Sequence, residues 1–272
     1  MHTREEKLQA FGRILDVLDE LREKCPWDRK QTNESLRPQT LEEVYELSDA
    51  ILKNEEKELS KELGDVLLHV IFYAKIGEEK QHFDIVDVIN FLCDKLIYRH
   101  PHVFSSAQVG DAEDVIKQWE MLKTKEKDGN KTVLSGVPDG LPPLLKAYRM
   151  QDKARGVGFD WEKKEDVWEK VKEEMGEYQA ELDAMAAAET DEEKAAAYDR
   201  AEDELGDFLF ATGNAARLYG LNPDTALERT CAKFRRRFTY LEEHTIRQGR
   251  NLTDMTLAEM DAIWDEGKAK GL

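Results

Sequence analysis

The sequence predicts an all-α protein, and three observations support this fold class. Of its 272 residues, 36% are charged, whereas Gly and Pro number only 16 and 7, a composition that favours long amphipathic helices. The apolar residues, 40% of the chain, recur mostly at spacings of three and four, which is the period of a helix face that packs inward. Alternation of Val, Ile and Thr with polar residues, the pattern of a β-strand, is absent from the sequence.

The first two helices are separated by a break and a polar stretch. Residues 3–24 carry apolar side chains at helical spacing, and the Cys25-Pro26-Trp27-Asp28 segment ends that pattern. Residues 29–39 are polar, so no helix is predicted there. Thr40 is the expected N-cap of the next helix, because Glu43 stands three positions later, as in a capping box.

Further helices are expected in the first half at 55–77, 84–99 and 111–127. The second of these ends before Pro101, because the residue before a proline disfavours helical backbone. The stretch 128–143 holds three of the seven prolines and three glycines, and it is the clearest linker of the chain. We therefore expect an N-terminal domain of residues 1–127 and a C-terminal domain of residues 144–272.

The second half repeats the organisation of the first. A helix is expected at 144–155, and the Gly-rich segment 156–161 breaks it. The low-complexity stretch 187–200 is expected to extend a turn or the helix ends beside it. Pro223 is expected to begin a helix, since proline is tolerated in the first helical turn. The remaining helices are expected at 163–186, 201–219, 223–247 and 256–269.

Composition narrows the function classes. The formal net charge of -18 argues against a nucleic-acid-binding protein, which normally presents a basic surface. It allows a small anionic substrate, provided that metal ions bridge the substrate to carboxylates. Cys25, Cys93 and Cys231 show no zinc-ligand spacing and suit thiols in a reducing compartment. Neither a signal peptide nor a long apolar run is present, so we expect a cytoplasmic protein with no membrane contact.

Two acidic motifs occur twice in the same order. In each half an EExxE run is followed by an ExxD run that is spelled Glu-Leu-Gly-Asp. Residues four apart on a helix differ by about 40° in direction and residues three apart by about 60°, so each run places its carboxylates on one face. The residues are Glu42, Glu43, Glu46, Glu62 and Asp65 in the first copy and Glu173, Glu174, Glu177, Glu204 and Asp207 in the second.

These motifs predict divalent metal sites. Like charges held close together raise one another's pKa, and bound Mg²⁺ removes that cost while bridging to phosphates. A single acidic run is commonly just a solvated helix face. However, both ExxD runs lie inside apolar segments, so Asp65 and Asp207 are expected beside the core, where an unpaired carboxylate is costly. We therefore expect Mg²⁺ at both motifs, with Mn²⁺ as a substitute.

Two basic motifs follow the acidic ones in both halves. A KxxxR run places Lys and Arg on one helix face, where they can hold phosphate oxygens, although a single such pair is commonly a surface pair. A WxxxK run offers a ring that can stack on a base and an ammonium that can reach a ribose or phosphate; packing between helices is the alternative for the tryptophans. The residues are Lys95, Arg99, Trp119 and Lys123, then Lys233, Arg237, Trp264 and Lys268.

Together these segments resemble the MazG family of nucleoside triphosphate pyrophosphohydrolases, in the all-α NTP pyrophosphatase superfamily. The likeness covers nearly the whole chain. CPWDRKQTNESLRPQTLEEVYEL, KELGDVLLHVIFYAK and YRHPHVF are similar to the N-terminal half of tandem-domain MazG proteins. RGVGFDW, VKEEMGEY, DELGDFLFA and KFRRRF are similar to the C-terminal half. The resemblance implies two tandem four-helix-type domains, a homodimeric helical bundle, and Mg²⁺-dependent hydrolysis of an NTP to NMP and pyrophosphate.

The resemblance also implies roles for residues of the second half. Glu174, Glu177, Glu204 and Asp207 would bind Mg²⁺, and Glu173 would orient water. Phosphates would be held by Lys170, Lys233 and Arg237, and the nucleoside end by Trp264 and Lys268.

In the first half, the corresponding metal ligands would be Glu43, Glu46, Glu62 and Asp65, with Lys95, Arg99, Trp119 and Lys123 toward substrate. Gln39 stands where the second half has Lys170, which would weaken phosphate binding there. Two other functions remain open. One is a narrower pyrophosphohydrolase for dUTP, dCTP or phosphoribosyl-ATP, and the other is a helical module that senses nucleotides without cleaving them.

Overall fold

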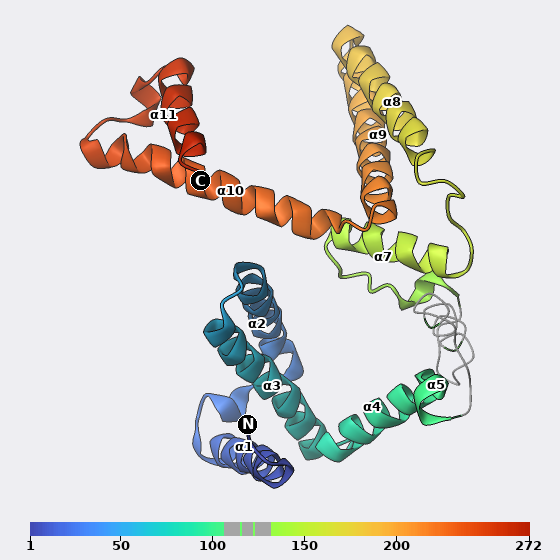
Figure 1. The fold of residues 1–272 in the computed structure, drawn as a ribbon, viewed down its shortest axis with the longest axis vertical. Coiled ribbons are helices and arrows are strands. Elements are labelled where there is room, and N and C mark those ends of the chain that lie inside the picture. The colour runs from blue at the N-terminus through green and yellow to red at the C-terminus, as the bar shows by residue number, and fades with distance from the viewer. Residues whose placement is uncertain (106–114, 116–121, 123–131) are drawn as a thin grey trace. The chain divides into compact units, whose positions relative to one another are not determined.

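A computed structural model of the chain describes residues 1–105, 115, 122 and 132–272. These residues form helices joined by turns and short loops, with no strand among them, which confirms the all-α prediction (Figure 1). None of the described helices is long and apolar enough to cross a membrane. Contacts divide the chain into two compact units, residues 1–108 and 109–272.

The first unit is built around the antiparallel pair formed by α2 and α3. Helix α1 packs on α3, and α4 follows α3 along the chain (Figure 1). The bounds are α1 Arg4–Lys24, the 3₁₀ turn η1 Asp28–Lys30, α2 Asn33–Lys53, α3 Glu56–Glu79, α4 Ile85–Arg99 and α5 Pro101–Phe104.

Helix α2 begins earlier than the sequence suggested. Thr32, not Thr40, is its N-cap: the Thr32 side chain accepts from the backbone N–H of Ser35, and the Ser35 hydroxyl accepts from the backbone N–H of Thr32. Thr40 lies inside the helix and donates its hydroxyl to the carbonyl oxygen of Leu36 at 3.0 Å. Residues 33–39 are therefore helical although they show no apolar spacing, because the cap at Thr32 and the buried side chain of Leu36 stabilise this first part of α2.

The core of the first unit joins α1, α2 and α3. It is made of Leu18, Leu36, Ile71, Phe72 and Ile76, each no more than 3% exposed. Burial of side chains of this size contributes about 1.5–3 kcal/mol each, so this cluster supplies much of the stability of the unit.

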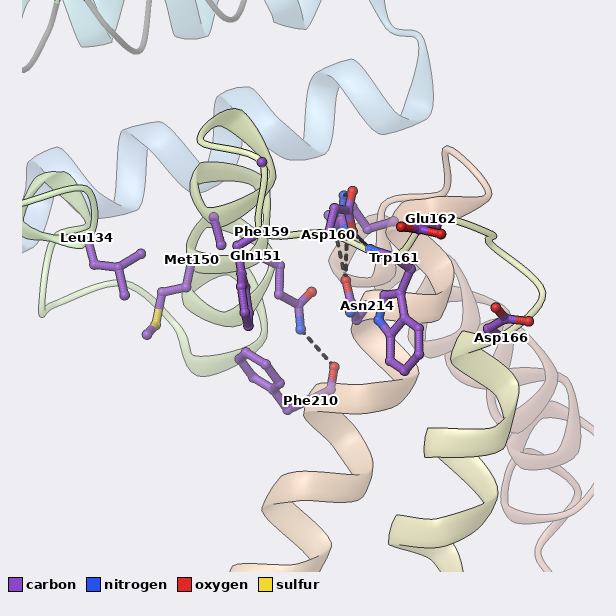
Figure 2. A pocket seen from close by; sticks show the side chains of 13 residues that line it. Leu134, Met150, Gln151, Phe159, Asp160, Trp161, Glu162, Asp166, Phe210 and Asn214 are labelled. Carbon is purple, nitrogen blue, oxygen red and sulfur yellow. Dashed lines mark hydrogen bonds and ion pairs between the residues drawn. The ribbon is translucent and has the colours of Figure 1, made fainter.

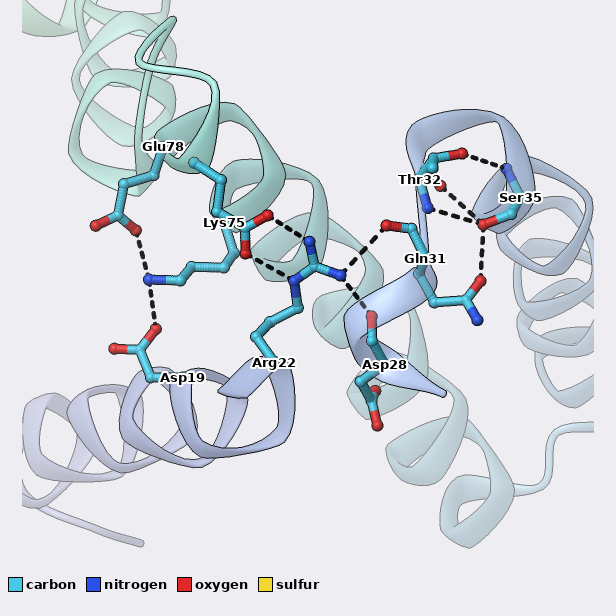
Figure 3. Close-up of polar contacts among 9 residues, drawn as sticks. Asp19, Arg22, Asp28, Gln31, Thr32, Ser35, Lys75 and Glu78 are labelled. Atoms are coloured by element: carbon cyan, nitrogen blue, oxygen red, sulfur yellow. Dashed lines mark hydrogen bonds and ion pairs between the residues drawn. The ribbon is translucent and has the colours of Figure 1, made fainter. Parts of the chain in front are cut away.

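A polar network fastens the end of α1 to α3. The guanidinium of Arg22 donates to both carboxylate oxygens of Glu79 and to the carbonyl oxygens of Asp28 and Gln31 (Figure 3). The segment between α1 and α2 is thus held by one side chain that is 10% exposed.

The second unit has a longer helix pair, α8 and α9, with α7 packed on α9 and α11 packed on α10 (Figure 1). The bounds are η2 Leu134–Gly136, α7 Pro143–Gly156, α8 Val167–Ala187, α9 Asp191–Leu218, α10 Pro223–Glu243, η3 Ile246–Gln248, η4 Leu252–Asp254 and α11 Leu257–Ala269.

The stretch 187–200, expected to extend a turn or helix ends, mostly lies in the first turns of α9. Thr190 caps the helix in a capping box with Glu193, and three acidic residues follow in the first turn, where the helix dipole favours negative charge. Helix α8 begins at Val167, four residues later than 163, the expected start. The predicted helix 111–127 falls mainly outside the described residues.

Small residues bring α8 and α9 close together. Their core contains Val167, Val171, Ala211 and Ala215, and Val167 is fully buried. Because alanine side chains are short, the two helix backbones approach closely, and the acidic motifs on α8 and α9 are held on facing helices.

Candidate functional site

The first acidic motif forms a compact group of carboxylates between α2 and α3. Ligand oxygens of Glu43, Glu62 and Asp65 all lie within 4.8 Å of one another. Glu62 is only 4% exposed: its Oε1 accepts from Lys61 Nζ at 2.9 Å, and its Oε2 has no partner among the described residues. A buried carboxylate oxygen without a donor fits a bound cation, since an unsatisfied charge is otherwise costly.

The electrostatics of this group favour a positive ion. Burial, followed by the charges of Asp65, Glu46 and Glu62, raises the pKa of Glu43 above its usual value of 4.5. Loss of solvent, followed by the charge of Glu62, raises the pKa of Glu46 as well, which places Glu46 near the group although its side chain is exposed. Glu42 is exposed. The carboxylates thus repel one another unless a cation lies between them.

The second acidic motif forms a similar group between α8 and α9. Ligand oxygens of Glu174, Glu177 and Glu204 lie within 4.8 Å of one another, and Glu174 is 6% exposed. A hydrogen bond to Glu174 is the first cause that raises the pKa of Glu177, ahead of loss of solvent and the charges of Glu174 and Glu204. Oxygen-only donors of this kind suit a hard divalent cation.

Lys170 is part of this second group. Its Nζ lies 2.5 Å from Glu174 Oε1 and 2.9 Å from Glu173 Oε1. The hydrogen bonds to Glu174 and Glu173 raise the pKa of Lys170 well above its usual value, so it stays charged. The first unit has Gln39 at the matching position, and its buried Glu62 is paired with Lys61 of α3 instead.

The position of the Asp207 side chain differs from the one predicted. It was expected beside the core, but it is exposed and its carboxylate lies outside the second group. Asp65, its counterpart, is half-buried and lies inside the first group. The reason is the direction of the side chain: on α9 the core face is taken by Phe208, Ala211 and Ala215, and Asp207 faces solvent.

The basic and aromatic residues of the second unit gather on α10 and α11. The Arg237 guanidinium lies 5.8 Å from the ring centre of Trp264, and Trp264 packs against Phe234 with ring centres 5.1 Å apart. Arg237 Nε also donates to the carbonyl oxygen of Leu272 at 2.7 Å. Lys233 and Lys268 are exposed. Within the described part of the chain, Lys233 and Arg237 form no hydrogen bond or ion pair with the acidic groups.

The corresponding residues of the first unit are only partly described. Lys95 Nζ on α4 lies 5.5 Å from the ring centre of Phe91, and Arg99 is half-buried at the end of α4. Trp119 and Lys123 lie outside the described residues. The structure therefore brings three of the predicted acidic residues of each unit into one group, leaves Glu42 and Asp207 exposed, and places Arg237 against Trp264.

Sequence reasoning missed a cavity in the second unit. It has a volume of about 700 Å³ and lies between α7, the start of α8, α9 and the loop 157–166 (Figure 2). Gln151 of α7 and Arg217 of α9 are buried in its wall, and Phe159 and Trp161 come from the Gly-Phe-Asp-Trp segment. The sequence indicates a helix break and part of the family resemblance in that segment, but it did not predict that the two aromatic side chains line a cavity.

Comparison with known proteins decides the family. Residues 31–104 match the family model described as the MazG nucleotide pyrophosphohydrolase domain. The chain is 37% identical over 266 residues to the nucleoside triphosphate pyrophosphohydrolase of Escherichia coli K12, which covers 96% of this chain and 98% of that protein. The chain belongs to the MazG family. It is also 40% identical over 265 residues to the MazG nucleoside triphosphate pyrophosphohydrolase/pyrophosphatase of Thermotoga maritima, covering 96% of each chain.

Another MazG relative differs in length. The uncharacterized protein YabN of Bacillus subtilis is 44% identical over 270 residues, which is 97% of this chain but 53% of that protein. The family model covers the first acidic motif, whereas the full-length relatives cover both motifs of this MazG chain.

Proposed function

We propose that this MazG protein hydrolyses nucleoside triphosphates to nucleoside monophosphate and pyrophosphate. The observation that carries the proposal is the group of Glu174, Glu177 and Glu204, whose ligand oxygens lie within 4.8 Å of one another on two packed helices. Family membership supports it, since the similar proteins of E. coli and T. maritima carry the name of this activity.

The acidic residues are proposed to hold Mg²⁺, with Mn²⁺ as a substitute. The donor sets are all carboxylate, and the unpartnered Oε2 of Glu62 fits a cation in the first group. The metal ligands would be Glu174, Glu177, Glu204 and Asp207 in the second unit and Glu43, Glu46, Glu62 and Asp65 in the first. Bound metal would supply charge neutralisation at phosphate oxygens and acidify a bound water.

The other residues have proposed roles toward substrate. Glu173, exposed beside the second group, would accept a proton from the water that attacks the α-phosphorus. Lys233 and Arg237 would offset the charge that builds on the leaving pyrophosphate. Lys170 would hold a phosphate, and Trp264 with Lys268 would contact the nucleoside end. Lys95, Arg99, Trp119 and Lys123 would act in the same way in the first unit.

Assembly belongs to the proposal as well. We infer a homodimer, because α4 and α10 leave large apolar side chains in solvent, among them Phe91 at 67% and Leu227 at 54% exposure. We also propose that the units are tandem domains of residues 1–127 and 144–272, joined by 128–143. The cytoplasmic location and the lack of nucleic-acid and membrane partners remain predictions from the sequence.

Pyrophosphate release from a panel of ribo- and deoxynucleoside triphosphates, with and without Mg²⁺, tests the function. Glu174→Gln should lower kcat at least about 100-fold, because it removes a charged ligand. Glu202→Gln is the control, since Glu202 is an exposed acid on α9 outside the group. The pair Asp65→Asn and Asp207→Asn shows which unit supports turnover.

Other outcomes would decide between the alternatives. Turnover confined to one deoxynucleotide or to phosphoribosyl-ATP would indicate the narrower enzyme. Nucleotide binding without any pyrophosphate release would refute the proposal and indicate a sensing module.

A further inference from the structure

A hydrogen-bonded network of three polar side chains lies between α2 and α3 of the first unit. Thr40 Oγ1 on α2 lies 2.9 Å from His69 Nδ1 and 2.6 Å from the hydroxyl oxygen of Tyr73, both on α3. The Thr40 hydroxyl also donates to the carbonyl oxygen of Leu36. His69 is only 8% exposed, and its ring is tilted against that of Tyr73, with ring centres 6.3 Å apart. The imidazole is therefore held in one orientation by contacts from both helices.

The three hydrogen bonds of Thr40 can exist together in one way only. A hydroxyl has one hydrogen and two lone pairs, and a carbonyl oxygen can only accept, so the Thr40 hydrogen goes to Leu36. The Tyr73 hydroxyl and His69 Nδ1–H must then both donate to Thr40. In a neutral ring this leaves the lone pair on His69 Nε2, which forms no hydrogen bond with any described residue.

His69 lies on the face of α3 that carries the first acidic group. At 100° per residue, Glu62, Asp65 and His69 fall within about 60° of one another around the helix. His69 follows Asp65 by one turn, or about 6 Å along the helix axis. Burial lowers the pKa of His69 and the charge of Asp65 opposes that shift, so the ring is near enough to this carboxylate to interact with it. The network thus forms the layer next to the carboxylates.

The second unit has apolar side chains at the equivalent positions. When the EExxE and Glu-Leu-Gly-Asp motifs of the two units are aligned, the three residues of the network correspond to Val171, Ala211 and Ala215. These are buried in the apolar core between α8 and α9. A helix pair of this kind therefore packs at that level without hydrogen bonds between side chains, and packing alone does not account for the imidazole of the first unit.

The distances favour an indirect contact between His69 and a metal ion. Its ring nitrogens are not among the ligand atoms of the first acidic group, which lie within 4.8 Å of one another. Mg²⁺ usually keeps several waters when carboxylates bind it, and the hydrogens of these waters need acceptors. We propose that His69 is a positioning residue of the first unit, whose Nε2 accepts a hydrogen bond from a water on the metal ion held by this group. The inference rests on the metal sites of the proposed function.

The ¹⁵N resonances of the histidine rings in the full-length protein at pH 8 test the proposal without measuring turnover. The rings are neutral there, because the usual pKa of histidine is about 6.5. The His69 resonances, which are those that His69→Gln lacks, should show hydrogen on Nδ1, and Mg²⁺ should shift the Nε2 resonance. His82, exposed beyond the end of α3, is the control and should not respond. Glu62→Gln should abolish the shift, whereas Glu174→Gln in the second unit should leave it unchanged.

Two variants separate the positioning of a water from a purely structural role. The side-chain amide of Asn reaches the place of Nδ1, so His69→Asn can keep the bond to Thr40 but lacks Nε2. The longer side chain of Gln places its amide near Nε2, so His69→Gln keeps an acceptor there. Calorimetric titration with Mg²⁺ in a Glu174→Gln background follows the first unit. Its dissociation constant should rise about tenfold in His69→Asn and stay near the starting value in His69→Gln.

The outcomes separate this inference from the proposed function. A hydrogen on Nε2, or an Nε2 resonance that does not respond to bound Mg²⁺, would overturn the inference and leave the metal site standing. An unchanged dissociation constant in His69→Asn, or an equal rise in both variants, would overturn it as well. If the first unit binds no Mg²⁺, the metal site and the inference both fail; if it binds Mg²⁺ but the protein releases no pyrophosphate, only the proposed function fails. If His69→Asn does not fold, the resonances of the wild type decide.

Discussion

At the scale of single residues, two largely buried charges of the first unit, Arg22 and Glu62, have different surroundings. The guanidinium of Arg22 makes four hydrogen bonds, two to the carboxylate of Glu79 and two to the backbone carbonyl oxygens of Asp28 and Gln31. Glu62 instead keeps a buried oxygen without a donor. The first arrangement is typical of a structural contact, and the second is typical of a site that awaits a ligand.

The ion pair between Arg22 and Glu79 predicts a pH dependence of stability. The hydrogen bond from Arg22 lowers the pKa of Glu79 below its usual value of 4.5. A carboxyl group whose pKa is lower in the folded state stabilises the fold above the unfolded pKa, and this contribution is lost as the pH falls through the folded pKa. Glu79→Gln should therefore cost about 1 kcal/mol at pH 7, because Glu79 is partly exposed, and the cost should shrink below pH 4.5.

Urea unfolding of the wild type and Glu79→Gln between pH 3 and pH 7 measures this difference. Glu20→Gln is a matched control, since Glu20 pairs with Lys24 on α1 with both side chains largely exposed. A cost that stays constant down to pH 3 would contradict the prediction.

Some site residues could be predicted from local helical spacing, whereas others depend on how the helices pack and could not. Glu62 and Asp65 were predicted because helical spacing places them on one face of α3, and Glu43 joins them because α2 packs against α3. Gln151 and Asn214 were missed because they line one cavity only after α7 packs on α9, and no local sequence pattern describes that packing. Asp207 was misplaced because its neighbours are apolar, although its own direction on α9 is outward.

At the scale of elements, apolar periodicity predicted where helices lie better than where they begin. The helix expected at 84–99 is α4, Ile85–Arg99, since Asp84 is a strong N-cap and His100-Pro101 ends it. The predicted start of α2 was wrong. Thr32 and Ser35 cap this helix, whereas the sequence analysis expected Thr40 and Glu43 to do so. Caps are satisfied by several residue types, so their position is hard to read from sequence alone.

The cap of α2 gives a prediction at this scale. Thr32→Ala should lower the free energy of unfolding by about 1 kcal/mol, because the backbone N–H of Ser35 loses its acceptor. Ser48→Ala, at an exposed position inside α2, should have little effect. Denaturant titration compares the two variants, and equal stabilities would refute the assigned cap.

At the scale of the whole molecule, the two units have separate cores, one around Ile71 and Phe72 and one around Val167 and Ala215. We therefore expect two transitions in calorimetric unfolding. Mg²⁺ should raise the midpoint of each transition, because a cation that binds only the folded carboxylate groups stabilises them by mass action. Each unit carries its own acidic group, so the two responses should be separable.

One variant in each acidic group shows which calorimetric transition belongs to which unit. Glu62→Gln should weaken the Mg²⁺ response of one transition and Glu174→Gln that of the other. A single transition that responds equally to both variants would show that the units unfold together, and a lack of any Mg²⁺ response would count against the metal sites.

The bonds of Lys170 to Glu173 and Glu174 have a consequence for the order in which ligands bind. Before Glu174 can turn fully toward a cation, the Lys170 ammonium needs another anion. A triphosphate provides that anion, so metal and substrate should each lower the dissociation constant of the other in the second unit. In the first unit Gln39 is uncharged, and the ammonium on the buried carboxylate is that of Lys61 on α3, so the exchange there would pass through a different and more exposed residue. The two units would then differ in cooperativity even where their carboxylates match.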